Sequence, residues 1–158
     1  MYRVLITGDI HPNGLKKLEQ ERDIEFQFSP DLPYEDVLRI IQPFHCILSR
    51  SETWVNKEMI EAAQELKVIA RAGVGVGNID VEYATERGIL VINTPGKNTN
   101  SAAELTIGLL LSAFRKIVPA HQSMQSLNWD RHRFNGGELM NKCSVSYTHL
   151  RAHETPAN

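Results

Sequence analysis

The chain has 158 residues, of which 17 are basic and 19 are acidic, so its formal net charge is -2. This balance argues against nucleic acid or an anionic membrane surface as a partner. Two cysteines cannot form a disulfide framework, and the N-terminal apolar stretch is too short for a signal segment or a membrane span. We therefore expect a cytoplasmic protein with one ordinary domain, or one domain and the beginning of another.

Short apolar runs alternate with helical patterns along the first part of the chain. The runs predicted as strands are residues 3–7, 24–28, 44–49, 66–70 and 89–93. The patterns predicted as helices are residues 12–22, 33–41, 56–64 and 80–87. Single helices between short strands supply the crossover connections that parallel strands need. The sequence therefore predicts a flavodoxin-like α/β domain, in which a five-stranded parallel sheet is doubly wound, with helices on both faces.

A longer helix is predicted next, and it differs in kind. Residues 101–104 (Ser-Ala-Ala-Glu) have the spacing of a capping box, and the pattern that follows to Phe114 is apolar on nearly every side. Such a helix is usually buried between two layers or two domains, so we expect it to belong to a second domain. Residues 122–137 mix aromatic, basic, Asn and Gly residues and are interpreted as a connector toward another strand.

Residues 145–155 (Val-Ser-Tyr-Thr-His-Leu-Arg-Ala-His-Glu-Thr) match the translation of a transposon end followed by a sequencing adaptor. We therefore expect residues 144–158 to be a non-native tail on a truncated reading frame, and we leave them out of fold and function reasoning. His149 and His153 stand four residues apart, which is the spacing of a zinc pair on a helix. No metal site is expected, because no further cluster completes a tetrahedral set of ligands.

Ligands bind open α/β sheets outside the carboxyl ends of the strands, so the loops after Ser49, Ala70 and Asn93 are the candidate sites. The first of these loops begins with Arg50 and Ser51. A fixed positive charge beside a hydroxyl suits a carboxylate or a phosphate better than an apolar ligand. A solvated surface pair is the alternative at these two positions.

The second candidate loop is Gly-Val-Gly-Val-Gly-Asn at residues 73–78, where backbone amides are able to approach a ligand closely. It is not the dinucleotide fingerprint G-x-G-x-x-G, because Asn78 stands where the last glycine is needed. A tight turn before a helix is the alternative. The third loop, residues 93–100, leads into the start of the long helix, where amides and the helix dipole favour an anion, or it is a capped loop without a ligand.

Four separated segments resemble the amino-terminal part of the D-2-hydroxyacid dehydrogenases. The segments are residues 50–51, 66–80, 93–95 and 101–105. The resemblance runs from about Met1 to about Lys142. It implies that residues 1–98 are part of a substrate domain, and that residues 99–143 hold the crossing helix and the start of a truncated, Rossmann-type NAD-binding domain.

By the same resemblance, Arg50 and Ser51 face the anionic end of the substrate. The backbone at Val74 and Gly75 lies over the substrate, with Val74 and Ala102 also near the NAD cofactor. The family usually has Asp at the position of Gly77. This departure is expected to loosen the turn.

The resemblance implies oxidation of a small 2-hydroxy acid by hydride transfer to NAD, in a parent enzyme that is a homo-oligomer. The family's catalytic His, its Glu partner and the carboxylate-binding Arg are expected outside this chain, so we predict that the chain alone is inactive. The expected substrate is 3-phosphoglycerate, at the entry to serine synthesis, and glycerate or hydroxypyruvate is the alternative. From a different class, a stand-alone anion-binding module also fits the Arg50 and glycine loops.

Overall fold

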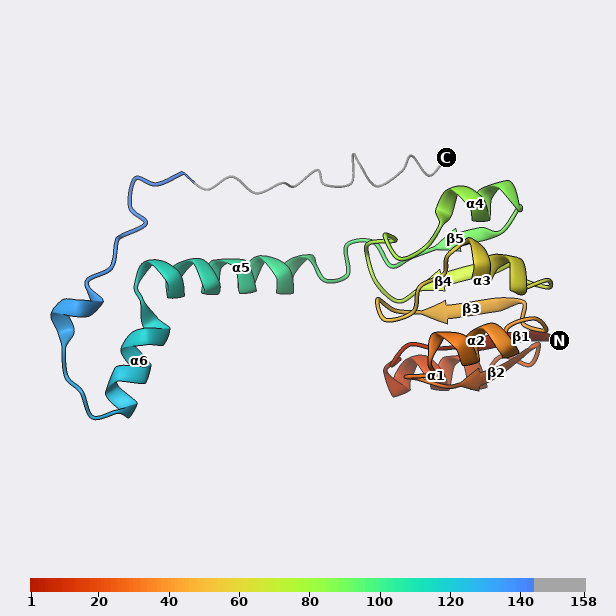
Figure 1. Cartoon of the computed structure of the whole chain (residues 1–158), viewed down its shortest axis with the longest axis horizontal. Coiled ribbons are helices and arrows are strands. Elements are labelled where there is room, and N and C mark those ends of the chain that lie inside the picture. Colours follow the sequence, from red (N-terminus) through yellow and green to blue (C-terminus); the bar gives the residue numbers. More distant parts are fainter. Residues whose placement is uncertain (144–158) are drawn as a thin grey trace. The chain divides into compact units, whose positions relative to one another are not determined.

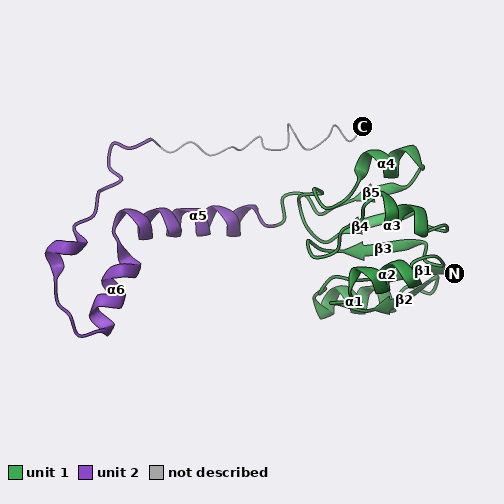
Figure 2. Ribbon diagram, viewed as in Figure 1, with its two compact units in different colours: residues 1–97 green, residues 98–158 purple. Residues whose placement is uncertain are grey.

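The computed structural model describes residues 1–143 (Figure 1). The chain divides into two compact units, Met1–Lys97 and Asn98–Asn158 (Figure 2). The tail predicted to be non-native, with His149 and His153, lies outside the described residues.

The first unit contains a five-stranded sheet in which every pair of neighbouring strands is parallel. The strands are β1 (Tyr2–Ile6), β2 (Ile24–Phe28), β3 (Cys46–Ser49), β4 (Val68–Arg71) and β5 (Leu90–Ile92). Their spatial order is β2-β1-β3-β4-β5, as Figure 1 shows. This is the order of flavodoxin-like sheets, so the predicted fold class is confirmed.

Four helices connect the strands: α1 (Pro12–Glu19), α2 (Tyr34–Ile40), α3 (Lys57–Ala62) and α4 (Val81–Glu86). Three begin at polar residues whose side chains accept a hydrogen bond from the first turn, His11 before α1, Asn56 before α3 and Asp80 before α4. All four are shorter than the apolar pattern predicted. The chain leaves each helix early because it must turn back toward the amino end of the next parallel strand.

The main core lies between the sheet and helices α2, α3 and α4. Leu5, Ile47 and Ile69 are direct neighbours across β1, β3 and β4, and all three are fully buried. Val37 of α2 and Met59 of α3 pack in the same cluster. This continuous row of buried apolar side chains holds the three central strands in place, and the carboxyl ends of these strands lie directly beyond it.

The opposite face of the sheet carries α1 and is only partly covered. Leu18 of α1 lines a hollow on this face together with Cys46, Leu48 and other apolar residues. Burial raises the pKa of the Cys46 thiol to about 11, and a backbone hydrogen bond from Ala70 offsets part of this rise. Leu90 of β5 stays 59% exposed, so this side of the sheet edge is open.

The second unit contains α5 (Thr99–Phe114), α6 (Ile117–Gln125) and a short 3₁₀-helix (Arg131–Phe134). The capping-box prediction was wrong, because α5 begins at Thr99 with Asn98 as its N-cap and Ser101 already lies inside the helix. Thr99 and Asn100 are the first two residues of α5, and Gly96, with a φ of 73°, lies in the loop before the helix.

The connector predicted over residues 122–137 was wrong in part. Its first residues belong to α6, which ends at Gln125. This helix starts directly after Lys116, whose backbone has the left-handed conformation. Within the described residues, no helix is both long and apolar enough to cross a membrane. The large apolar side chains of α5 are mostly exposed, including Leu105 at 63% and Leu109 at 61%.

Candidate functional site

A row of polar side chains ends the central strands, two residues beyond the apolar core row. Ser49 of β3 pairs with Arg71 of β4, and the N–H of Thr7 continues the β1 ladder by donating to Leu48 O at 3.0 Å. Side chains alternate along a strand, so these three residues lie on the same face as the buried core. Thr7 and Ser49 are themselves buried, at 3% and 0% exposure. The carboxyl edge of the sheet is therefore built from polar groups held in fixed positions.

Arg50 follows β3 directly and is exposed at this edge. Its guanidinium Nη1 donates to the backbone oxygen of Asp9 at 3.2 Å, which ties it to the loop after β1. Gly8 makes this approach possible, since a Cβ there would lie 2.7 Å from Arg50 Cγ and 2.9 Å from Arg50 N. Ser51 is also exposed. The edge thus presents a cation and a hydroxyl at consecutive exposed positions.

The glycine loop after β4 is fastened by its carbonyl groups. Gly73 O accepts from Thr94 N at 2.9 Å and from Thr94 Oγ1 at 3.1 Å. Val74 O accepts from the side-chain amide of Asn93 at 2.6 Å. The loop after β5 therefore holds two successive carbonyls of the glycine loop.

The third carbonyl of the glycine loop, at Gly75, accepts a hydrogen bond from the guanidinium of Arg71. In a trans peptide the N–H points opposite to the C=O, so the N–H groups of residues 74–76 face away from these donors. None of the three N–H groups donates to another group among residues 1–143. Free N–H groups of this kind are able to donate to an anion.

Asn78 joins the Arg50 loop to the glycine loop. Its side-chain Nδ2 donates to Arg50 O at 2.9 Å and to Thr53 O at 2.6 Å. Next to it, Val55 and Ile79 form a parallel β-bridge. The exposed cation and the outward N–H groups are therefore parts of one connected structure.

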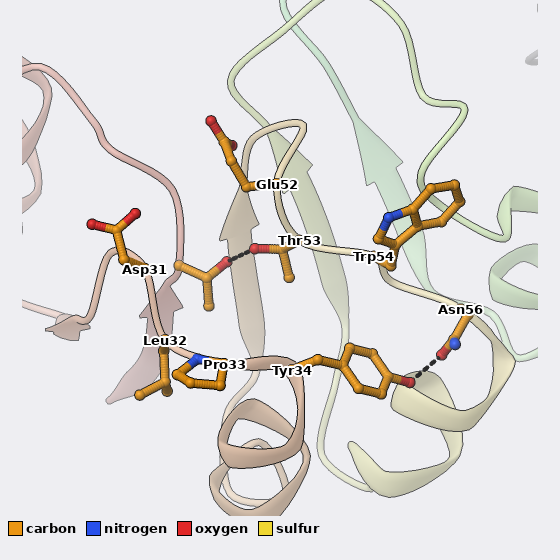
Figure 3. A pocket seen from close by; sticks show the side chains of 9 residues that line it. Asp31, Leu32, Pro33, Tyr34, Glu52, Thr53, Trp54 and Asn56 are labelled. Atoms are coloured by element: carbon orange, nitrogen blue, oxygen red, sulfur yellow. Dashed lines mark hydrogen bonds between the residues drawn. The ribbon is translucent and has the colours of Figure 1, made fainter.

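A hollow of about 750 Å³ lies beside this edge, between the loops after β1, β2 and β3 (Figure 3). Among its lining residues, Thr53 donates a hydrogen bond at 2.9 Å to Thr7, and Trp54 and Tyr34 supply aromatic side chains. Burial raises the pKa of Tyr34, whose hydroxyl also donates to Glu58. The charged lining residues are Asp31 and Glu52, both acidic, so this hollow suits an anion poorly despite its size.

Four of the five predicted site residues lie at the carboxyl edge of the first unit, namely Arg50, Ser51, Val74 and Gly75. Ala102 lies in the first turns of α5, in the second unit, and is exposed. Gly77 is exposed, and a Cβ there would meet nothing within 4 Å, so an Asp would fit at this position without steric conflict.

Sequence reasoning missed the residues that hold the site: Gly8, Arg71, Asn78 and Asn93. Gly8 and Asn93 follow or end a predicted strand, and this position was the available signal for those two residues. The hydrogen bonds of Arg71 and Asn78 depend on how the glycine loop folds back, which the strand rule does not give. Among residues 1–143, no group of three or more His, Cys, Asp or Glu side chains stands close enough to hold a metal ion.

The fold and the polar carboxyl edge define a flavodoxin-like α/β domain with a candidate ligand site, and comparison with known proteins identifies its family. The sequence pattern of the D-isomer specific 2-hydroxyacid dehydrogenases, catalytic domain, matches residues 4–154. The chain therefore belongs to the D-isomer specific 2-hydroxyacid dehydrogenase family. It is 45% identical over 142 residues to the D-3-phosphoglycerate dehydrogenase of Methanocaldococcus jannaschii, which covers 90% of this chain and 27% of that relative.

Solved structures of the family agree with the fold. The TT0316 protein from Thermus thermophilus superposes with a TM-score of 0.78 at 32% identity, over 87% of this chain and 45% of that one. The NAD⁺-bound 3-phosphoglycerate dehydrogenase of Entamoeba histolytica has a TM-score of 0.68 at 28% identity, over 87% of this chain and 43% of that one. The chain spans about a quarter of the length of the curated relatives that it matches.

Proposed function

We propose that this chain supplies the substrate-side part of an NAD-dependent D-2-hydroxyacid dehydrogenase, and that the whole protein oxidises D-3-phosphoglycerate to 3-phosphohydroxypyruvate. The observation that carries this proposal is the carboxyl edge of the sheet, where the outward N–H groups of residues 74–76 are joined through Asn78 to the exposed Arg50. Such an edge suits a small molecule with more than one anionic group. The D-3-phosphoglycerate dehydrogenases among the relatives support the choice of substrate.

Within this proposal, the chain binds and orients the substrate. Arg50 and Ser51 hold one anionic end by charge and by a hydroxyl hydrogen bond. The N–H groups of Val74 and Gly75 hold the carboxylate, because free amide donors in a row favour a negative group.

In this proposal the nicotinamide of NAD lies beside Val74. Ala102, in the second unit, is a cofactor contact that rests on the family resemblance alone. NAD, when bound, supplies the acceptor for the hydride. This part of the chain then serves to keep the substrate carbon within van der Waals reach of that acceptor. The partner of the whole protein is thus a small 2-hydroxy acid.

The test uses the protein expressed from the uninterrupted gene. Its rate of NAD reduction is measured with 3-phosphoglycerate and with glycerate, and we expect a clear preference for 3-phosphoglycerate. Arg50→Gln removes the charge that the substrate needs, and hydrogen bonds to charged groups contribute about 1.5–3 kcal/mol. We therefore expect kcat/KM for 3-phosphoglycerate to fall by roughly 10- to 100-fold.

Arg39→Gln is the matched control for this loss of a cation. Arg39 pairs with Asp36 on the exposed surface of α2 at 2.9 Å, and surface pairs of this kind contribute little. Its kcat/KM should equal that of the wild type. Equal rates on glycerate and 3-phosphoglycerate, or equal effects of the two Arg substitutions, would contradict the proposed substrate and the proposed role of Arg50.

A further inference from the structure

We propose that Asn78 is a positioning residue, whose side-chain amide locks the loop that carries Arg50 and Ser51 onto the glycine loop. The contact between Asn78 and the loop that carries Arg50 and Ser51 lies entirely within the first unit. Its consequence for substrate affinity rests on the proposed function. The Asn78 side chain does not touch the proposed substrate site, so it acts through the backbone that it holds.

The evidence begins with the geometry of one nitrogen atom. Asn78 Nδ2 donates to Arg50 O at 2.9 Å and to Thr53 O at 2.6 Å, which uses both of its hydrogens. These two carbonyls stand at the two ends of the four-residue segment 50–53. Asn78 is only 7% exposed, so water does not readily replace either bond. One side chain therefore closes the segment into a fixed loop.

The backbone beside Asn78 already joins the two loops without its side chain. Val55 N donates to Asn78 O at 2.8 Å, and Asp80 N donates to Val55 O at 2.9 Å. These backbone bonds join residue 55 to residues 78 and 80 and do not involve residues 50–53. The side-chain amide of Asn78 is thus the group that connects this junction to the segment bearing Arg50 and Ser51.

The chemistry of the position explains why asparagine stands there. Glycine, which would complete the dinucleotide fingerprint, offers no side-chain donor, and serine offers a single hydroxyl hydrogen. An ionised aspartate has the same shape but only acceptor atoms, and it would face two carbonyl oxygens. An amide supplies two N–H donors on one atom, as two neighbouring carbonyls require.

Arg50 is anchored at a second point, by its own bond to Asp9 O at 3.2 Å, and Thr53 is anchored by its hydroxyl bond to Thr7. Those two bonds involve the side chains of Arg50 and Thr53, whereas Asn78 binds the backbone oxygens of the same two residues. Loss of the Asn78 amide should therefore leave the side-chain bonds possible while the backbone of residues 50–53 becomes mobile. The expected signature is faster motion of residues 50–53 within a protein that remains folded.

The experiment compares Asn78→Ala, Asn78→Ser and the control Asn56→Ala in the full-length protein. Asn56 also makes side-chain bonds, since it caps α3 by accepting from Met59 N at 3.0 Å and accepts from the Tyr34 hydroxyl at 2.8 Å. It makes no hydrogen bond to residues 50–53 or to the glycine loop. Both alanine substitutions should lower Tm, so thermal stability alone does not separate the two roles.

Two measurements separate them. Trypsin cleavage of the exposed Arg50–Ser51 bond, followed by mass spectrometry, should quicken at least about tenfold in Asn78→Ala and less in Asn78→Ser, and should not change in Asn56→Ala. KM for 3-phosphoglycerate should rise about tenfold in Asn78→Ala with a smaller change in kcat, and again not in Asn56→Ala. Partial recovery in Asn78→Ser keeps the test decisive if Asn78→Ala unfolds.

Unchanged cleavage after Arg50 in folded Asn78 variants would overturn the inference, whatever the enzyme does. Faster cleavage with an unchanged KM would overturn its consequence for the substrate. A wild-type protein that does not oxidise 3-phosphoglycerate would instead overturn the proposed function, while the cleavage measurement would still decide whether Asn78 locks the loop.

Discussion

Gly8→Ala is the substitution whose effect follows most directly from the site's geometry. The added Cβ would lie 2.7 Å from Arg50 Cγ and 2.9 Å from Arg50 N. The side-chain atom is able to move, but the backbone nitrogen is fixed between β3 and the segment that Asn78 holds. Overpacking of this kind costs about 1–3 kcal/mol. The Arg50 loop and the loop after β1 must separate to accept the methyl group.

The free energy of unfolding should therefore fall by about 1–3 kcal/mol in urea denaturation followed by far-ultraviolet circular dichroism. For a unit of 97 residues, each 1 kcal/mol corresponds to a Tm decrease of about 4–8 °C.

Gly77→Ala is the control for Gly8→Ala, because a Cβ at residue 77 meets nothing within 4 Å. Its stability should match the wild type or exceed it slightly, since alanine restricts the unfolded chain. Equal destabilisation by the two substitutions, or a Gly8→Ala protein as stable as the wild type, would refute the close packing of the β1 loop against Arg50.

Three further outcomes are expected. Ile47→Ala should lower the free energy of unfolding by about 2–5 kcal/mol in urea denaturation, because Ile47 is fully buried in the central core row. Iodoacetamide should modify the exposed Cys143 before Cys46 in a mass-spectrometric time course. With a pKa of about 11, the Cys46 thiol is ionised to roughly one part in a thousand at pH 8, and its labelling should quicken as pH rises. The isolated 158-residue chain should self-associate in sedimentation velocity, and Leu105→Lys with Leu109→Lys should reduce this, because both leucines are exposed on one side of α5.

The fold was predictable because its signal is carried by apolar periodicity. All five strands occur where short apolar runs stand, and β2 matches its predicted residues at both ends. Parallel pairing followed from the single helices between strands, and it needed no knowledge of side-chain contacts. Element ends were less accurate, as in α1, which stops at Glu19 instead of Arg22. Helix ends depend on the path to the next strand, and periodicity does not encode that path.

The candidate site could be predicted from the sequence only where a residue directly follows a strand. Arg50 and Ser51 follow a strand, so the rule for open sheets finds them. Arg71 and Asn78 could not be found in this way. Arg71 ends its strand as a polar residue on the core face, and its partner Gly75 O becomes known only when the loop folds back. In the sequence, Asn78 is only a mismatch to a glycine motif, whereas its two hydrogen bonds show what an amide does there.

The glycine loop after β4 owes its shape to its donors more than to its glycines. Among residues 1–143 the glycines with positive φ are Gly88 and Gly96, so the left-handed region is not used in residues 73–77. What turns the N–H groups outward is the capture of three successive carbonyls by Thr94, Asn93 and Arg71. These donors come from the ends of β4 and β5, and so the sheet itself orients the loop. Within the proposed function, Asn93→Ala should therefore raise KM for 3-phosphoglycerate more than Gly77→Ala does.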